Sequence, residues 1–194
     1  MMSIPLLLTL SRILLGPLFL VLYLYYRELG IPFTALPLVL LVLIAISELS
    51  DLFDGRFARR YNQVTELGKV LDPMADSLFR LCVLFAFTQG VVQLPLLLVL
   101  VFFFRDMIIS TLRTVCALKG VALAARMSGK VKAVIQASIG TFILLLMCAY
   151  ALGYLNLSVL RIVSFYSALV GALYTVYSGI EYLFAHRAVI RKAF

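Results

Sequence analysis

The chain has 194 residues, 64% of them hydrophobic, and a formal net charge of +8. Soluble domains are usually about 45–50% apolar, and one compact core of this size could not bury so much apolar surface. The composition therefore excludes an ordinary soluble domain. Because the basic residues lie beside long apolar stretches, they indicate topology signals and contact with anionic lipid, and we expect no nucleic-acid partner.

Six stretches are long enough and apolar enough to cross a membrane, which takes about 20 residues. We predict spanning helices at residues 5–26, 33–58, 70–88, 94–112, 131–153 and 158–184. The breaks between them are short, and no linker or repeat separates one part of the chain from another. The sequence therefore predicts one all-α, polytopic membrane domain over residues 1–194, with six transmembrane helices.

Lysine and arginine residues are distributed unevenly among the predicted connections. They gather in the connections at 56–69 and 113–132 and in the C-terminal tail, whereas the three opposite connections hold only Arg27 and Arg161. Basic connections stay on the cytoplasmic side of a membrane. We therefore expect both termini, and both basic connections, to face the cytoplasm.

Acidic residues are concentrated in one part of the chain, since six of the nine lie between positions 48 and 76. An ionised carboxylate near hydrocarbon costs at least about 2.5–3.5 kcal/mol, so such groups persist where they are paired, bind metal or face water. At about 100° per residue, Asp51, Asp54, Gly55 and Ala58 share one arc of a helix. Two carboxylates and two minimal side chains thus lie on one face.

The next predicted helix repeats this arrangement, because Gly68, Asp72 and Asp76 also share one face. A short connection lets the two faces meet, and four converging carboxylates would repel one another without cations. Oxygen ligands of this kind suit Mg²⁺ or Mn²⁺, and two such ions can clamp the attacking and leaving oxygens of a phosphoryl transfer. The small residues leave room for a nucleotide base or a pyrophosphate. The alternative, four solvated carboxylates paired with nearby arginines, does not explain two matched faces.

The same segment resembles the signature of the CDP-alcohol phosphotransferase family at all eight of its fixed positions. The segment reads Asp51-x2-Asp54-Gly55-x2-Ala58-Arg59-x8-Gly68-x3-Asp72-x3-Asp76. The resemblance implies that family's fold, two divalent metal ions, and displacement of CMP from a CDP-linked lipid. It implies that Asp51, Asp54, Asp72 and Asp76 bind the metals and that Asp76 is the general base. The residues that it implies for the donor nucleotide are Asp51, Gly55, Ala58, Arg59 and Gly68.

Other segments resemble the phosphatidylglycerophosphate synthases of that family. They are Ile4-Pro5 with Leu8-Thr9-x2-Arg12, Arg105-Asp106 with Ser110 and Arg113, and Gly129-Lys130-Val131-Lys132 with Gln136. In that group CDP-diacylglycerol donates the phosphatidyl group to glycerol 3-phosphate. The departures at Ser3, Ser77 and Ala133 leave open an inositol phosphate acceptor, or phosphatidylglycerol as in cardiolipin synthases.

A phosphorylated alcohol needs cations near the metals, and the residues that we expect to bind it are Arg105, Arg113, Lys130 and Lys132. Arg105 lies deep in an apolar stretch, and its pairing with Asp106 is unfavourable because helix neighbours point about 100° apart. We therefore expect Arg105 to face inward toward a substrate phosphate. Arg113, Lys130 and Lys132 should lie at the cytoplasmic ends of their helices.

The resemblance also implies the partners and the location of the protein. The partners are CDP-diacylglycerol, a small phosphorylated alcohol and membrane lipids, and a homodimer is left open. The location is a bacterial inner membrane, with the active site facing the cytoplasm. Two remote alternatives are an intramembrane prenyltransferase, which normally has two separated aspartate-rich motifs, and a divalent-cation transporter, whose polar residues would be spread through the bilayer depth.

Overall fold

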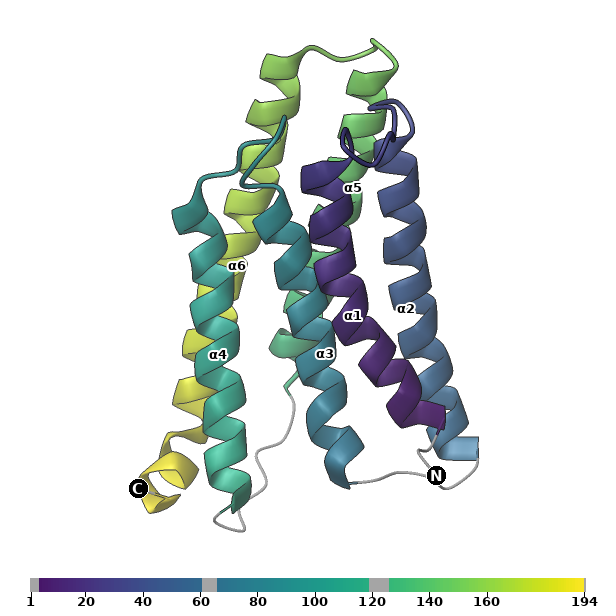
Figure 1. Ribbon diagram of the computed structural model, residues 1–194. Helices are drawn as coiled ribbons and strands as arrows, with labels where there is room; N and C mark the ends of the chain where they lie inside the picture. Colours follow the sequence, from purple (N-terminus) through teal and green to yellow (C-terminus); the bar gives the residue numbers. More distant parts are fainter. Residues whose placement is uncertain (1–3, 61–65, 119–125, 194) are drawn as a thin grey trace.

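The computed structural model describes residues 4–60, 66–118 and 126–193, and the side chains of 4–8, 51–60, 66–71, 117, 188–189 and 191–193 lie outside the described set. The described residues form six α-helices and no strand, which confirms the all-α prediction. The helices are α1 (Ile4–Tyr25), α2 (Leu36–Arg60), α3 (Glu66–Ala86), α4 (Leu96–Leu118), α5 (Met127–Ala151) and α6 (Leu157–Ala193). They run alternately up and down, so α1 begins and α6 ends at the same end of the bundle (Figure 1).

The helix boundaries differ from the predicted ones for two reasons. α2 begins at Leu36, not at 33, because Pro37 is suited to the first turn of a helix. α4 continues to Leu118, not to 112, and α6 continues to Ala193, not to 184. The apolar stretch of a sequence marks the part that suits a lipid environment, whereas the hydrogen-bonded helix can continue into polar surroundings.

The first helix is fixed against the third by an aromatic core. The ring of Phe19 packs edge-on against Phe79 and against Phe87, with centroids 6.3 Å apart in both pairs. The hydroxyl of Tyr23 donates a hydrogen bond of 3.0 Å to the backbone oxygen of Gln89. Since α3 also contacts α4 and α5, it lies centrally in the bundle and brings its carboxylates next to several other helices.

Close packing of α4, α5 and α6 depends on Gly171. A Cβ atom added there would lie 2.2 Å from Cδ1 of Ile139 and 3.3 Å from Cζ of Phe102. Helices in lipid associate through such close contacts between small residues and the side chains of a neighbouring helix. Gly171 therefore lets α6 approach α5 closely enough for the polar residues further along these helices to meet.

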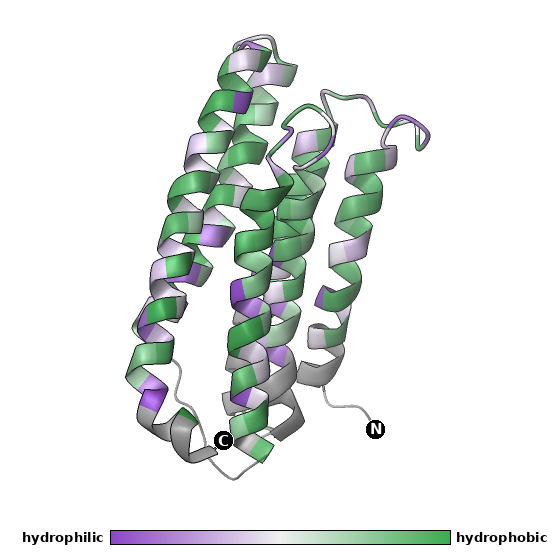
Figure 2. Cartoon of the chain, turned by 90° about the vertical axis from the view of Figure 1, so that its left-hand side faces the viewer, coloured by the Kyte–Doolittle hydropathy of each residue, from purple (hydrophilic) through white to green (hydrophobic). Residues whose placement is uncertain are grey.

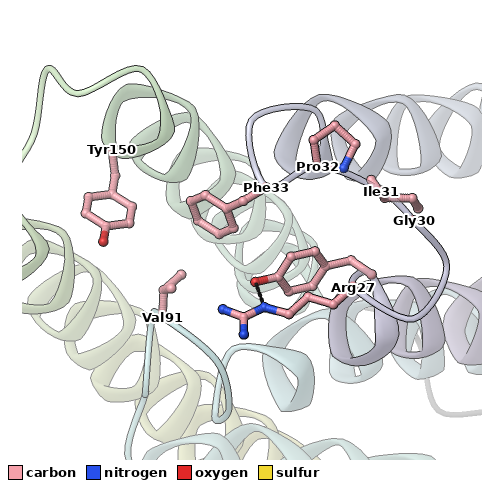
Figure 3. Close-up of a pocket in the computed structure, with 8 residues that line it drawn as sticks. Arg27, Gly30, Ile31, Pro32, Phe33, Val91 and Tyr150 are labelled. Atoms are coloured by element: carbon pink, nitrogen blue, oxygen red, sulfur yellow. Dashed lines mark hydrogen bonds between the residues drawn. The ribbon is translucent and has the colours of Figure 1, made fainter.

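The outer surface of the bundle is strongly apolar. Large hydrophobic side chains such as Leu14, Leu97 and Val134 are more than half exposed. Two helices in the described part of the chain, Met127–Ala151 and Leu157–Arg187, are both long and apolar enough to cross a membrane. On the helices, strongly hydrophilic residues are concentrated in the half of the bundle nearer the chain ends (Figure 2). Six membrane crossings, and their orientation, stay a prediction.

Candidate active site

Two of the four predicted metal-binding carboxylates lie where α3 packs against α1. The Thr9 hydroxyl donates a 2.6 Å hydrogen bond to Oδ1 of Asp72, and the Arg12 guanidinium forms an ion pair with Oδ1 of Asp76. Thr9 and Arg12 are each 1% exposed, whereas the Asp76 side chain is 20% exposed. The first helix thus supplies a neutral donor to one carboxylate and a cation to the other, and both carboxylates are held in fixed orientations.

The donor chemistry of Asp72 and Asp76 fits a hard divalent cation, because carboxylate oxygens one helical turn apart are ligands that Mg²⁺ and Mn²⁺ accept. The side chains of Asp51 and Asp54 lie outside the described residues, and the described ones contain no group of three or more His, Cys, Asp or Glu that could hold a metal ion. The described residues therefore fit two of the expected ligands, and the complete four-carboxylate centre stays a prediction.

The residues predicted to bind the donor nucleotide lie toward the end of α2 and at the start of α3. Asp51, Gly55, Ala58 and Arg59 are in the last turns of α2, and Gly68 is in the first turn of α3. Their side chains lie outside the described residues. Both segments are helical, as was assumed when these residues were assigned to shared helix faces.

A second polar cluster joins α4 to α5. The Lys132 ammonium donates to both carboxylate oxygens of Asp106, at 2.7 and 2.6 Å, and to Oε1 of Gln136 at 2.5 Å. Lys132 is 2% exposed and Asp106 is 7% exposed. All three ammonium donors are therefore used inside the protein, an arrangement that argues against the expectation that Lys132 contacts the acceptor directly.

The expectation for Arg105 is wrong in one respect. Its Nη1 lies 3.1 Å from Oδ1 of Asp106, although the two residues are neighbours on α4. The long side chain of arginine spans the angle between adjacent positions, which an argument from Cβ directions overlooks. The aliphatic part of the Arg105 side chain packs against α6, since a Cβ added at Gly179 would lie 3.2 Å from the Cγ of Arg105. The guanidinium turns inward, as predicted, and reaches the first turn of α5 beside Gly129, where an added Cβ would lie 3.7 Å from Nη2.

The remaining two predicted acceptor residues are accessible. Lys130 is exposed in the first turn of α5, and Arg113 is half-buried near the end of α4. Neither forms an ion pair with any carboxylate whose side chain is described. Both therefore have ammonium or guanidinium donors that a ligand can reach.

The two polar clusters lie at the same depth in the bundle. α3 and α5 run in the same direction, and they contact each other where a Cβ on Gly140 would lie 3.2 Å from Cγ1 of Val83. Asp76 precedes Val83 by seven residues on α3, and Ala133 precedes Gly140 by seven residues on α5. Asp76 is therefore level with Ala133, the residue after Lys132. The carboxylates of α3 and the cations of α4 and α5 therefore lie at one level along the bundle.

Three polar residues of the interior did not emerge as site residues from the sequence. Arg80 lies one turn after Asp76 and lines a small cavity together with Glu48 and Gln136. Thr9 and Arg12 belong to a segment that carries the resemblance, and each contacts a predicted metal ligand. Their spacing of three residues on an apolar helix, which puts both on one face, is the signal that could have identified them.

Sequence comparison now identifies the family. The profile of the CDP-alcohol phosphatidyltransferase family matches residues 2–180. The chain belongs to the CDP-alcohol phosphatidyltransferase family. It is therefore an enzyme, and the resemblance noted in the 51–76 segment is confirmed over nearly the whole chain.

Curated members of the CDP-alcohol phosphatidyltransferase family align with about 70% of the chain. A protein of Rickettsia typhi is 33% identical over 138 residues, which are 70% of this chain and 72% of the relative. A Bacillus subtilis protein is 35% identical over 138 residues, 68% and 71% of the two chains. A Salmonella paratyphi A protein is 36% identical over 140 residues, 69% and 72% of the two chains. Each of the three is named a CDP-diacylglycerol–glycerol-3-phosphate 3-phosphatidyltransferase.

Proposed function

We propose that the chain transfers a phosphatidyl group from CDP-diacylglycerol to glycerol 3-phosphate, releasing phosphatidylglycerophosphate and CMP in phospholipid biosynthesis. The names of the three relatives support this donor and this acceptor. The observation that carries the proposal is the common depth of Asp76 and the Arg105 cluster, because the acceptor has a hydroxyl that must lose a proton and a phosphate that needs a cation.

The reaction would proceed with Asp76 as the general base. The acceptor hydroxyl oxygen attacks the phosphorus of the phosphatidyl group, its proton passes to a carboxylate oxygen of Asp76, and the bond from that phosphorus to the CMP oxygen breaks. Arg12 holds Asp76 in place through its ion pair. Arg105, Arg113 and Lys130 would bind the acceptor phosphate, since their donors match phosphate oxygens.

Asp51, Asp54, Asp72 and Asp76 would hold two divalent ions, Mg²⁺ or Mn²⁺. When bound, these ions would neutralise part of the phosphate charge and lower the pKa of the acceptor hydroxyl. Members of this family are generally dependent on divalent metal. Asp72 contributes an oxygen whose direction is set by Thr9. Asp51, Gly55, Ala58, Arg59 and Gly68 would receive the cytidine diphosphate, with the small residues admitting it close to the backbone.

We further propose that all six helices span a bacterial inner membrane as one domain, with both termini and the active site on the cytoplasmic side. The apolar outer surface and the alternating helix directions support six crossings with both termini on one side. The basic connections at 56–69 and 113–132 favour the cytoplasm as that side. Single cysteines placed at Gly153 and at Leu118, on a background without Cys82, Cys116 and Cys148, would test it. A membrane-impermeant maleimide added to intact cells should label position 153 and spare position 118; the reverse pattern would refute the orientation.

The acceptor is tested by offering single alcohols to the purified protein. In detergent with CDP-diacylglycerol and Mg²⁺ or Mn²⁺, CMP release is followed with glycerol 3-phosphate, myo-inositol 1-phosphate, serine or phosphatidylglycerol. We expect release with glycerol 3-phosphate alone. Release with a different alcohol would keep the transfer chemistry and replace the acceptor, and no release with any of them would refute the proposal.

A further inference from the structure

Asp106 bonds to two cations at once. Its Oδ1 accepts from Nη1 of Arg105 at 3.1 Å and from Nζ of Lys132 at 2.7 Å, and its Oδ2 accepts from the same ammonium at 2.6 Å. The side chains of Asp106, Lys132 and Arg105 are 6%, 3% and 14% exposed. Three charged groups of two different helices therefore form one buried cluster with a net charge of +1.

The burial of this cluster is not explained by stability. Taking an ion pair out of water costs several kcal/mol per ion, and replacing a buried pair with apolar residues is often neutral or stabilising. Charged residues inside membrane segments are rare and are a functional hypothesis by default. The excess positive charge points to an anion as the missing component of the cluster's charge balance.

The division of hydrogen bonds within the cluster distinguishes its two cations. All three donors of the Lys132 ammonium are engaged, by Asp106 and Gln136. A guanidinium has five N–H donors, and Arg105 uses one of its nitrogens on Asp106, while its Nε has no hydrogen-bond partner among the described residues. Arg105 is therefore the member of the cluster that retains donors for a ligand.

Arg105 is also directed toward the level of the predicted metal ligands. Lys132 lies five residues after the start of α5, whereas α4 extends twelve residues beyond Asp106. At 1.5 Å per residue, α5 begins about 10 Å short of the end of α4, so its first turn lies well inside the bundle. Gly129, in this turn, is the residue that Nη2 of Arg105 approaches, and Asp76 is level with Ala133 nearby.

We propose that Asp106 is a positioning residue for acceptor binding. Its carboxylate holds the Arg105 guanidinium through one nitrogen and directs the remaining donors at the acceptor phosphate. Lys132 donates to both carboxylate oxygens of Asp106 and balances the carboxylate charge. Asp106 therefore orients the Arg105 guanidinium while the positive charge of Arg105 stays available to a ligand. Lys132 is thus a counter-charge and does not contact the substrate. This inference rests on the proposed function, in which Arg105 binds the acceptor phosphate.

The test compares Asp106→Asn with the double variant Asp106→Leu/Lys132→Met, which removes both charges of the pair and should fold even if the single variant does not. CMP release gives the KM for glycerol 3-phosphate and the KM for CDP-diacylglycerol. We expect both variants to raise the KM for glycerol 3-phosphate about tenfold or more, as for loss of a hydrogen bond to a charged group, with the KM for CDP-diacylglycerol unchanged.

Glu181→Gln is the matched control. Glu181 accepts from Arg126 at 2.5 Å and from Ser128, so the control weakens a carboxylate ion pair between α6 and the start of α5. This ion pair lies close to Arg105 but does not include it, so the control separates the role of Asp106 from a general disturbance of this region. It should leave both KM values unchanged. A second readout needs no turnover: glycerol 3-phosphate should raise the temperature at which wild-type protein is lost from gel filtration after heating, and Asp106→Asn should abolish that shift.

Three outcomes would overturn the inference. They are unchanged KM values in both variants, equal increases in both KM values, and an acceptor-induced thermal shift that survives in Asp106→Asn. Failure of the proposed function itself would look different, because wild-type protein would then release no CMP with glycerol 3-phosphate. A normal acceptor KM in Arg105→Lys would remove the role of Arg105 while leaving the transfer activity established.

Discussion

Thr9 allows a sharp test of whether α1 organises the metal ligands. Thr9→Val keeps the shape of the side chain and removes the hydroxyl that donates to Oδ1 of Asp72 at 2.6 Å. Thr9 is 1% exposed, so water cannot readily replace the lost donor. A hydrogen bond to a charged group contributes about 1.5–3 kcal/mol, and removing a partner of a metal ligand typically lowers metal affinity about 10–100-fold.

We therefore expect Thr9→Val to raise the Mn²⁺ concentration for half-maximal CMP release by about tenfold or more, with the maximal rate partly recovered at high Mn²⁺. Direct Mn²⁺ binding, followed by electron paramagnetic resonance of the free ion, should weaken in parallel. Thr88→Val is the matched control, since the Thr88 hydroxyl donates to the backbone oxygen of Phe85 at 2.7 Å, far from Asp72. An unchanged Mn²⁺ dependence in a folded Thr9→Val protein would refute the reasoning.

Three further predictions address the base, the acceptor and the packing. Asp76→Asn should abolish turnover while CDP-diacylglycerol binding, measured by equilibrium dialysis of labelled lipid in detergent, persists; normal turnover would remove the base assignment. Lys130→Ala should raise the KM for glycerol 3-phosphate more than the KM for CDP-diacylglycerol, because the exposed ammonium has no described ion-pair partner; an unchanged acceptor KM would leave Lys130 as a topology signal. Gly171→Ala should lower stability by about 1–3 kcal/mol through overpacking against Ile139 and Phe102, seen as a lower temperature of loss in gel filtration, and a temperature equal to wild type would contradict the packing.

Much of the fold could be predicted because six apolar stretches are long enough to cross a membrane, where a helix satisfies its backbone hydrogen bonds within the segment. The number of helices and their order follow from these stretches. Their ends do not, because the sequence beyond the apolar part of α4 and α6 is compatible with a helix but does not require one. The close approach of α6 at Gly171 depends on two side chains from other helices, and no local pattern reveals it.

Helical spacing predicted that Asp72 and Asp76 share one face of a helix, and both carboxylates indeed contact α1. Their role as metal ligands stays a prediction. The partners of the cations could not be found, since Asp106 and Lys132 come from different helices and only tertiary packing decides that they meet. For the same reason the sequence did not reveal that Lys132, expected to contact the substrate, is paired with Asp106 in the interior.

The central claim is transfer of the phosphatidyl group to glycerol 3-phosphate, and mass spectrometry of the lipid product tests it most directly. Purified protein is incubated with CDP-diacylglycerol, glycerol 3-phosphate and Mn²⁺, and the lipids are extracted. We expect phosphatidylglycerophosphate in an amount equal to the CMP released, and none from Asp76→Asn. CMP release accompanied by phosphatidic acid alone would mean hydrolysis without transfer, and would contradict the account.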